Sequence, residues 1–170
     1  EKRGESIKNK FPDLEKLNKL IKKYNITDSE PTKTFFSYML AHQKITGKID
    51  SYLSRFEVTS TQISILLLLV ISENGFETPG SISRKLGLSN PTISNVIKTL
   101  NKKELVKKEV SEKDKRFCNI CITSKGLIFL NEVMSEYHLK YERLLMNFTS
   151  EELKYLKHNS LKLFCSLDFF

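Results

Sequence analysis

Apolar residues recur every three or four positions over most of the chain, which is the spacing of one face of an α-helix. The pattern predicts an amphipathic helix over residues 11–24, a break at residues 25–31 and a longer helix over residues 35–56. Gly47 lowers the helix propensity of the longer segment without necessarily interrupting it. The first third of the chain is therefore expected to consist of helices that each bury one face.

Capping boxes mark the start of two further helices. Thr59 with Gln62, and Thr149 with Glu152, place a threonine three positions before a glutamine or glutamate, so that side chain and backbone satisfy one another. The first box opens the run ISILLLLVI, which is too short to span a bilayer and is predicted to be the buried central helix. The second box opens a helix that continues toward the end of the chain, after a helical pattern over residues 126–148.

Two short helices are predicted in the middle of the chain. Thr78 is expected to cap a helix that begins with Pro79, because proline lacks the amide hydrogen that would be unpaired there. Gly87 supplies the left-handed residue that ends this helix, and Ser89 caps the next one. The predicted buried positions of the second helix are Ile93, Val96, Ile97 and Leu100.

After these two helices, apolar residues recur at every second position instead of every third or fourth. Val106 and Val110 can share one strand face, and Ile120 and Ile122 can share one on the return strand, so a two-stranded hairpin with residues 111–116 at its tip is predicted. Helix, tight turn, helix and ribbon form a winged helix-turn-helix. The expected fold is mainly α with a small β-hairpin wing.

The second of the two short helices has a polar outer face. With its apolar positions buried, the opposite side presents amide, hydroxyl and ammonium groups and no large apolar side chain. Such groups suit the base edges and phosphates of double-stranded DNA, although a polar face taken alone is equally consistent with a solvated helix surface. The candidate DNA-binding residues here are Ser89, Asn90, Pro91, Thr92, Ser94, Asn95, Lys98 and Lys102.

The predicted wing tip adds a second set of candidates, Lys113, Asp114, Lys115 and Arg116. Arg116 is the best suited to a narrow A·T-rich minor groove, because a guanidinium is cheaper to dehydrate than an ammonium. Asp114 is expected to brace the tip by accepting hydrogen bonds. The alternative is an ordinary charged hairpin loop.

Positive charge is concentrated in the same region. Residues 81–125 contain 11 Lys and Arg against 4 Asp and Glu, so they carry +7 of the net charge of +8. A basic patch confined to one unit is the footprint expected of phosphate neutralisation.

The segment TPGSISRKLGLSNPTISNVIKTLNKKELVKKEVSEKDKRFCNICITSKG resembles the DNA-binding core of the MarR family of bacterial transcription regulators. The resemblance extends to VTSTQISILLLL and spans roughly residues 32–165. Its most specific part is the wing pattern, matched by Asp114, Arg116, Ile120, Ile122, Thr123 and Gly126. The resemblance implies a homodimeric repressor that binds a pseudo-palindromic operator. A winged-helix module that binds another protein through the same face is the alternative.

The resemblance also implies an organisation. A single domain of 170 residues is expected, in which residues 58–125 form the winged helix-turn-helix and residues 1–57 and 126–170 are dimerisation helices that interlock with those of a second subunit. The alternative is that these helices pad a monomer. No signal peptide or transmembrane run is recognised in the sequence, which favours a cytoplasmic protein that does not bind membranes.

Members of this family often bind small phenolic or lipophilic effectors near the dimerisation helices. By this resemblance Phe35, Tyr38, Met39 and His42 are candidates to line an effector pocket, and the alternative is that this stripe is plain core.

Cysteine spacing argues against a metal or redox centre. Cys118 and Cys121 are separated by an odd offset within a predicted strand, so their thiols point to opposite faces. The three histidines are scattered, and the sequence shows no nucleophile triad, phosphate loop or paired carboxylates. Neither a cofactor nor an enzymatic activity is expected.

Overall fold

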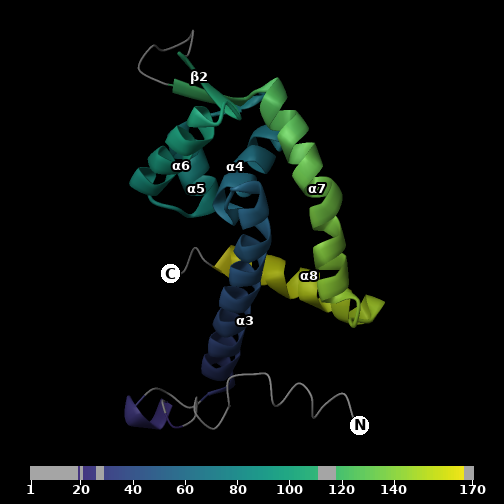
Figure 1. Cartoon of the computed structure of the whole chain (residues 1–170). Helices are drawn as coiled ribbons and strands as arrows, with labels where there is room; N and C mark the ends of the chain where they lie inside the picture. Colours follow the sequence, from purple (N-terminus) through teal and green to yellow (C-terminus); the bar gives the residue numbers. More distant parts are fainter. Residues whose placement is uncertain (1–18, 20, 26–28, 111–117, 167–170) are drawn as a thin grey trace. The chain divides into compact units, whose positions relative to one another are not determined.

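The computed structural model describes residues 19, 21–25, 29–110 and 118–166. The chain divides into two compact units, Glu1–Ile63 and Ser64–Phe170. Figure 1 labels the main helices and the strand β2.

The first unit is dominated by helix α3 (Glu30–Leu53), which the 3-10 turn η1 (Ser54–Phe56) follows. The Ser29 side chain caps α3 by accepting from the Thr32 amide, and Pro31 lies in its first turn. The predicted break therefore ends earlier than its sequence pattern suggested, because proline is compatible with the first turn of a helix. Gly47 lies within α3 and does not interrupt it.

Helix α4 (Ser60–Ile71) begins at the predicted capping box. The Gln62 side chain accepts from the Thr59 amide at 3.0 Å, and the Thr59 hydroxyl accepts from the Gln62 amide at 3.3 Å. The apolar run that follows contributes Ile63, Ile65, Leu66 and Leu69 to the core. Its last residues differ from the prediction of a buried helix, since Val70 and Ile71 are exposed.

The second unit continues with β1 (Phe76–Glu77), α5 (Pro79–Leu86), α6 (Asn90–Lys102), β2 (Val106–Val110) and β3 (Cys118–Ile122). The three strands form an antiparallel sheet in the order β1-β3-β2. The two-stranded ribbon predicted from the sequence was incomplete, because β1 has only two residues and shows no alternation to detect. Strand β1 joins the wing sheet directly to the start of α5.

The alternating apolar residues of the wing strands are buried only in part. Val106 and Ile120 are fully buried, as expected for the core face of the hairpin. Val110 has the same strand parity as Val106 but is 67% exposed. The hairpin extends beyond the helices that cover its base, so its outer half has an apolar position without a core.

Two helices complete the second unit. Helix α7 (Ser124–Leu145) begins directly after β3 and is capped by Thr123, and α8 (Ser150–Cys165) begins at the second predicted capping box. In Figure 1, α7 runs away from the sheet as a long helix before the chain turns into α8. The core of this unit collects apolar side chains from α4, α5, α6, the sheet and α7: Ile65, Leu66, Leu69, Ile82, Ile93, Ile97, Leu100, Leu105, Val106, Ile120, Leu130 and Val133.

Candidate nucleic-acid interface

Local signals fix the geometry of the helix-turn-helix. The Thr78 side chain accepts from the Ser81 amide at the start of α5, and Gly87 ends this helix with φ 64°. In the turn, the Leu88 amide donates to the Ser83 carbonyl at 3.1 Å, and the Ser83 hydroxyl donates to the Leu88 carbonyl at 2.6 Å. Ser89 then caps α6, so only three residues separate the two helices. The signals predicted at Thr78, Pro79, Gly87 and Ser89 are all confirmed.

Helix α6 presents the polar face that the sequence predicted. Ile93, Ile97 and Leu100 are buried, while Val96 is half-buried. The candidate residues on the opposite side are all exposed: Ser89, Asn90, Pro91, Thr92, Ser94, Asn95, Lys98 and Lys102. The predicted exposure of these side chains is therefore confirmed, and their contact with DNA stays a prediction.

Some hydroxyl groups on this face already form hydrogen bonds with neighbouring groups of the same helix or its cap. The hydroxyls of Ser89 and Thr92 share a hydrogen bond of 2.8 Å, and the Thr99 hydroxyl donates to the Asn95 carbonyl at 3.1 Å. Within the described part of the chain, no hydrogen bond or ion pair engages the side chains of Asn95, Lys98 or Lys102. The Asn95 amide and the Lys98 and Lys102 ammonium groups therefore retain their bonding capacity.

The structure adds two exposed cations to this region that the sequence analysis did not single out. Arg84 lies in the last turn of α5, and Lys108 lies on β2. Lys107, in contrast, pairs with the Glu109 carboxylate at 2.6 Å on the same strand. Neither residue belongs to the periodic pattern of α6. The local excess of positive charge was therefore the only sequence signal for a role of Arg84 and Lys108 in this surface.

A buried carboxylate supports the first helix of the motif. Glu77 on β1 is 7% exposed and accepts from the Ser81 hydroxyl and the Lys85 ammonium, both at 2.5 Å. Burial raises the pKa of Glu77, but hydrogen bonds from Lys85, Ser81 and Ser72 together with the Lys85 charge outweigh it and leave the pKa below its ordinary value of 4.5. The ionised carboxylate therefore ties β1 to both turns of α5.

The chain is similar to known proteins that share this helix-turn-helix. The model of the MarR family matches residues 58–117, which contain α4, the helix-turn-helix and the start of the wing. The HTH-type transcriptional regulator YwaE of Bacillus subtilis is 33% identical over 115 residues, covering 67% of this chain and 66% of that protein. The chain belongs to the MarR family.

Other MarR-family comparisons agree. The transcriptional repressor MprA of Escherichia coli is 27% identical over 111 residues, or 65% of this chain and 63% of that protein. The crystal structure of the MepR–DNA complex from S. aureus is 26% identical, covers 78% of this chain and 96% of that chain, and has a TM-score of 0.69. These findings confirm the winged helix fold and the class of transcriptional regulators rather than enzymes.

The wing tip of this MarR-family chain lies outside the described residues. The candidates Lys113, Asp114, Lys115 and Arg116 fall in that segment, so the roles predicted for them remain predictions. The flanking strands are described, and their register pairs Val110 with Cys118 at the outer end. The segment 111–117 therefore joins the outer ends of a formed hairpin.

Cysteines on the wing behave as the spacing predicted. Cys118 lies opposite Val110 and Cys121 opposite Lys107, positions of different strand parity, so the thiols face opposite sides of the sheet. Burial, followed by the hydrogen bond from its thiol to Glu109, raises the pKa of Cys121. A thiol that stays protonated is a poor nucleophile. Among the described residues, no group of three His, Cys, Asp or Glu side chains is arranged to hold a metal ion.

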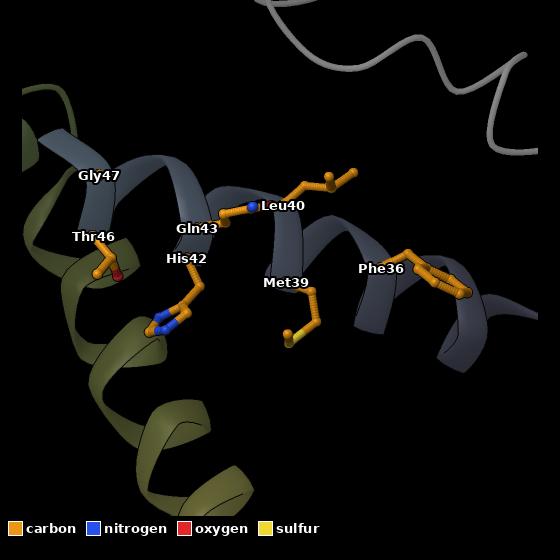
Figure 2. A pocket seen from close by; sticks show the side chains of 7 residues that line it. All are labelled: Phe36, Met39, Leu40, His42, Gln43, Thr46 and Gly47. Carbon is orange, nitrogen blue, oxygen red and sulfur yellow. The ribbon is translucent and has the colours of Figure 1, made fainter. Parts of the chain in front are cut away.

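Helix α3 borders an open hollow of about 640 Å³ in the first unit. Met39 and His42, two of the four residues proposed to line an effector pocket, border it, and in Figure 2 their side chains project from the same side of the helix. Phe35 and Tyr38 are not among its lining residues, although Tyr38 stacks on His42 with ring centroids 6.1 Å apart. The remaining lining residues are Phe36, Leu40, Gln43, Thr46 and Gly47.

Over the described ranges, no single helix is long and apolar enough to cross a bilayer, and only Glu30–Phe56 and Ser60–Ile71 taken together as a bent pair reach the required length and composition.

Proposed function

We propose that this MarR-family regulator is a homodimer that binds double-stranded DNA through α6 and represses transcription from a pseudo-palindromic operator. The observation that carries the proposal is the exposed face of α6, where amide and ammonium groups stand free of partners among the described residues. The relative MepR has been solved in a DNA complex, which supports the same mode of binding for this chain.

Each polar side chain on α6 fits a defined target. Asn95 has the donor and acceptor needed to pair bidentately with an adenine edge in the major groove. Lys98 lies one turn further along and suits guanine or phosphate, while Lys102 at the end of the helix is placed for the DNA backbone. Lys108 on β2 and Arg84 on α5 extend the basic surface on either side of α6.

The wing supplies the second contact in this proposal. Lys113, Lys115 and Arg116 approach the neighbouring phosphates, and Arg116 enters a narrowed minor groove while Asp114 braces the tip. Support comes from the formed strands β2 and β3, which carry this segment at their outer ends.

Exposed apolar side chains support dimerisation. Every described residue of α8 is exposed, including Leu153, Leu156 and Phe164. On α7, Leu139 and Leu144 are also exposed. An apolar surface of this extent is uncommon on a monomer, and a second copy of the same chain is the occupant that the family membership favours.

The proposal also includes control of DNA binding by a small-molecule effector. The hollow beside α3 is walled by Phe36, Met39 and Leu40 with His42 and Gln43 as polar contacts, which suits a small aromatic or lipophilic molecule. Repression is supported by the relative MprA, which is named a transcriptional repressor. Binding of the molecule would release the operator.

Selection of bound sequences from random DNA tests the DNA-binding proposal directly. The purified protein is expected to enrich a pseudo-palindrome, and its affinity is expected to fall steeply as salt rises, because bound phosphates release counterions. Asn95→Ala and Lys98→Ala should each weaken binding by about 1–3 kcal/mol without changing the melting temperature. Asn74→Ala, an exposed position in the turn before β1, is the matched control.

The outcomes separate this proposal from a protein-binding module. No enriched DNA sequence, or equal binding by wild type and both α6 variants, would rule out the recognition role of α6. A protein-binding face normally carries aromatic or methionine anchors, and the sequence of α6, NPTISNVIKTLNK, contains neither.

A further inference from the structure

A single residue, Leu105, links the end of α6 to the start of α7 through its backbone. The Leu105 amide donates to the Leu100 carbonyl of α6 at 3.0 Å. The Leu105 carbonyl accepts from the Thr123 amide at 3.1 Å, and Thr123 is the N-cap of α7. The Leu105 side chain is buried, at 3% exposure. The backbone of this one buried residue is therefore hydrogen-bonded both to α6 and to the N-cap of α7.

The Thr123 hydroxyl reinforces this link in three directions. It donates to the carbonyl of Glu104 at 2.7 Å, lies 3.2 Å from the carbonyl of Leu105, and accepts from the Gly126 amide at 3.0 Å. The same oxygen thus caps α7 and holds the segment that leaves α6. Few side chains other than serine can supply both functions from this position.

Gly126 sets how closely the two segments approach. It is buried in the first turn of α7, and a Cβ atom there would overlap the Leu105 carbonyl oxygen and crowd the Ile122 side chain. The overlap with a backbone atom cannot be relieved by rotating a side chain. Any larger residue would push the start of α7 away from Leu105.

A surface ion pair spans the same joint. Glu104 adopts the left-handed conformation, with φ 61°, directly after the C-cap of α6, and its carboxylate pairs with Lys125 of α7 at 2.6 Å. Both side chains are exposed, so the pair is expected to contribute little on its own. The connection therefore depends mainly on the hydrogen bonds of Thr123 and of the Leu105 backbone.

We propose that this joint, which consists of Leu105, Thr123 and Gly126, makes α6 and α7 one rigid body, with Thr123 as a positioning residue that sets the distance between the two α6 helices of the dimer. The inference rests on the proposed function, in which α7 and α8 join the two subunits. If α7 is held by the partner and α6 is fixed to α7, the two reading helices cannot adjust independently to the DNA.

Operators with altered spacing between half-sites test this inference. One added base pair rotates a half-site by about 34° and moves it by about 3.4 Å. Wild type is expected to lose about tenfold or more in affinity when one base pair is added or removed. Thr123→Val, which keeps the shape but lacks the hydroxyl, should lose less than about threefold, with its affinity for an isolated half-site unchanged. Thr123→Ser, which restores the hydroxyl, should regain the wild-type spacing preference.

A residue that only stabilised the fold would behave differently. Equal losses by Thr123→Val on all spacings, with the preference for one spacing retained, would overturn the proposal, as would a wild type that tolerates all spacings.

Hydrogen exchange measured on wild type keeps the proposal testable if Thr123→Val fails to fold. The amides of Leu105, Thr123 and Gly126 should be protected to the same degree in the free and the DNA-bound dimer. Loss of protection in either state would contradict a rigid joint. Absence of any DNA binding by wild type would instead refute the proposed function, and the exchange of the free protein would still test the joint.

Discussion

Helices α6 and α8 are both amphipathic, but of the two only α6 buries its apolar face in the part of the chain that the structure describes. Ile93, Ile97 and Leu100 of α6 are almost completely buried by neighbouring helices and the sheet. On α8, Leu156 is 44% exposed and Phe164 is 67% exposed. The same sequence period thus accompanies a buried face in one region and an exposed apolar face in the other. Periodicity identifies the face that will be buried and does not identify what buries it.

Substitution of one apolar residue in each helix gives the largest expected contrast. Ile97→Ala leaves a cavity in a filled core and should lower the free energy of unfolding by about 2–5 kcal/mol at any protein concentration. Leu156→Ala should weaken self-association, so its effect on unfolding should depend on protein concentration. Urea denaturation at several concentrations, with light scattering, measures both. A concentration-independent loss for Leu156→Ala would mean that α8 packs within its own chain.

Acidification should affect the helix-turn-helix more than the α7–α8 region. The pKa of folded Glu77 lies below its ordinary value of 4.5, so its stabilising effect is complete above that value and is lost as the pH falls through the folded pKa. Hydrogen bonds to a charged group typically contribute about 1.5–3 kcal/mol.

Glu77→Gln isolates this effect from that of other carboxylates. The variant should be less stable than wild type at pH 7, and the difference should shrink as the pH is lowered below 4.5. Thermal melts across this range measure the difference, with Glu73→Gln, an exposed neighbour, as the control. A constant difference between Glu77→Gln and wild type at all pH values would show that the charge on Glu77 is not what stabilises α5.

The smallest expected effect is at the start of α8. Thr149→Ala removes a capping box in which the Thr149 amide donates to Glu152 at 2.7 Å, and should cost about 1 kcal/mol. Because α8 makes its main contacts outside the chain in our proposal, this loss should appear in the dissociation constant of the dimer. Analytical ultracentrifugation of Thr149→Ala and Thr149→Ser compares the two, since serine preserves the cap. Unchanged self-association of Thr149→Ala would separate the integrity of α8 from dimerisation.

The sequence predicted best what depends on neighbouring residues. Thr78, Gly87 and Ser89 bound their helices as expected because caps act on the next few backbone groups. Strand β1 was missed because two residues carry no period, and its pairing with Ile120 and Cys121 is formed across more than forty positions. The exposure of Val110 was missed for a related reason, since alternation does not tell how far the supporting helices extend.

The candidate interface was predictable to a similar degree. The exposed face of α6 follows from its period, but the roles of Glu77 and Thr123 depend on contacts between elements that no local pattern contains. Arg84 and Lys108 lie beyond the periodic face, so only the structure distinguishes them from the paired Lys107.

The hydrogen bond between the hydroxyls of Ser89 and Thr92 also has an entropic consequence. These two side chains at the start of α6 are already ordered, whereas no hydrogen bond or ion pair, as far as the described chain extends, fixes the side chains of Asn95 and Lys98. Immobilising a flexible side chain at an interface costs about 0.5–1.5 kcal/mol. The start of α6 can therefore bind a ligand with little loss of conformational entropy. In the middle of the helix, the contacts with the ligand must offset the entropic cost of ordering the side chains. A mismatched partner would be penalised most where the side chains are least ordered beforehand.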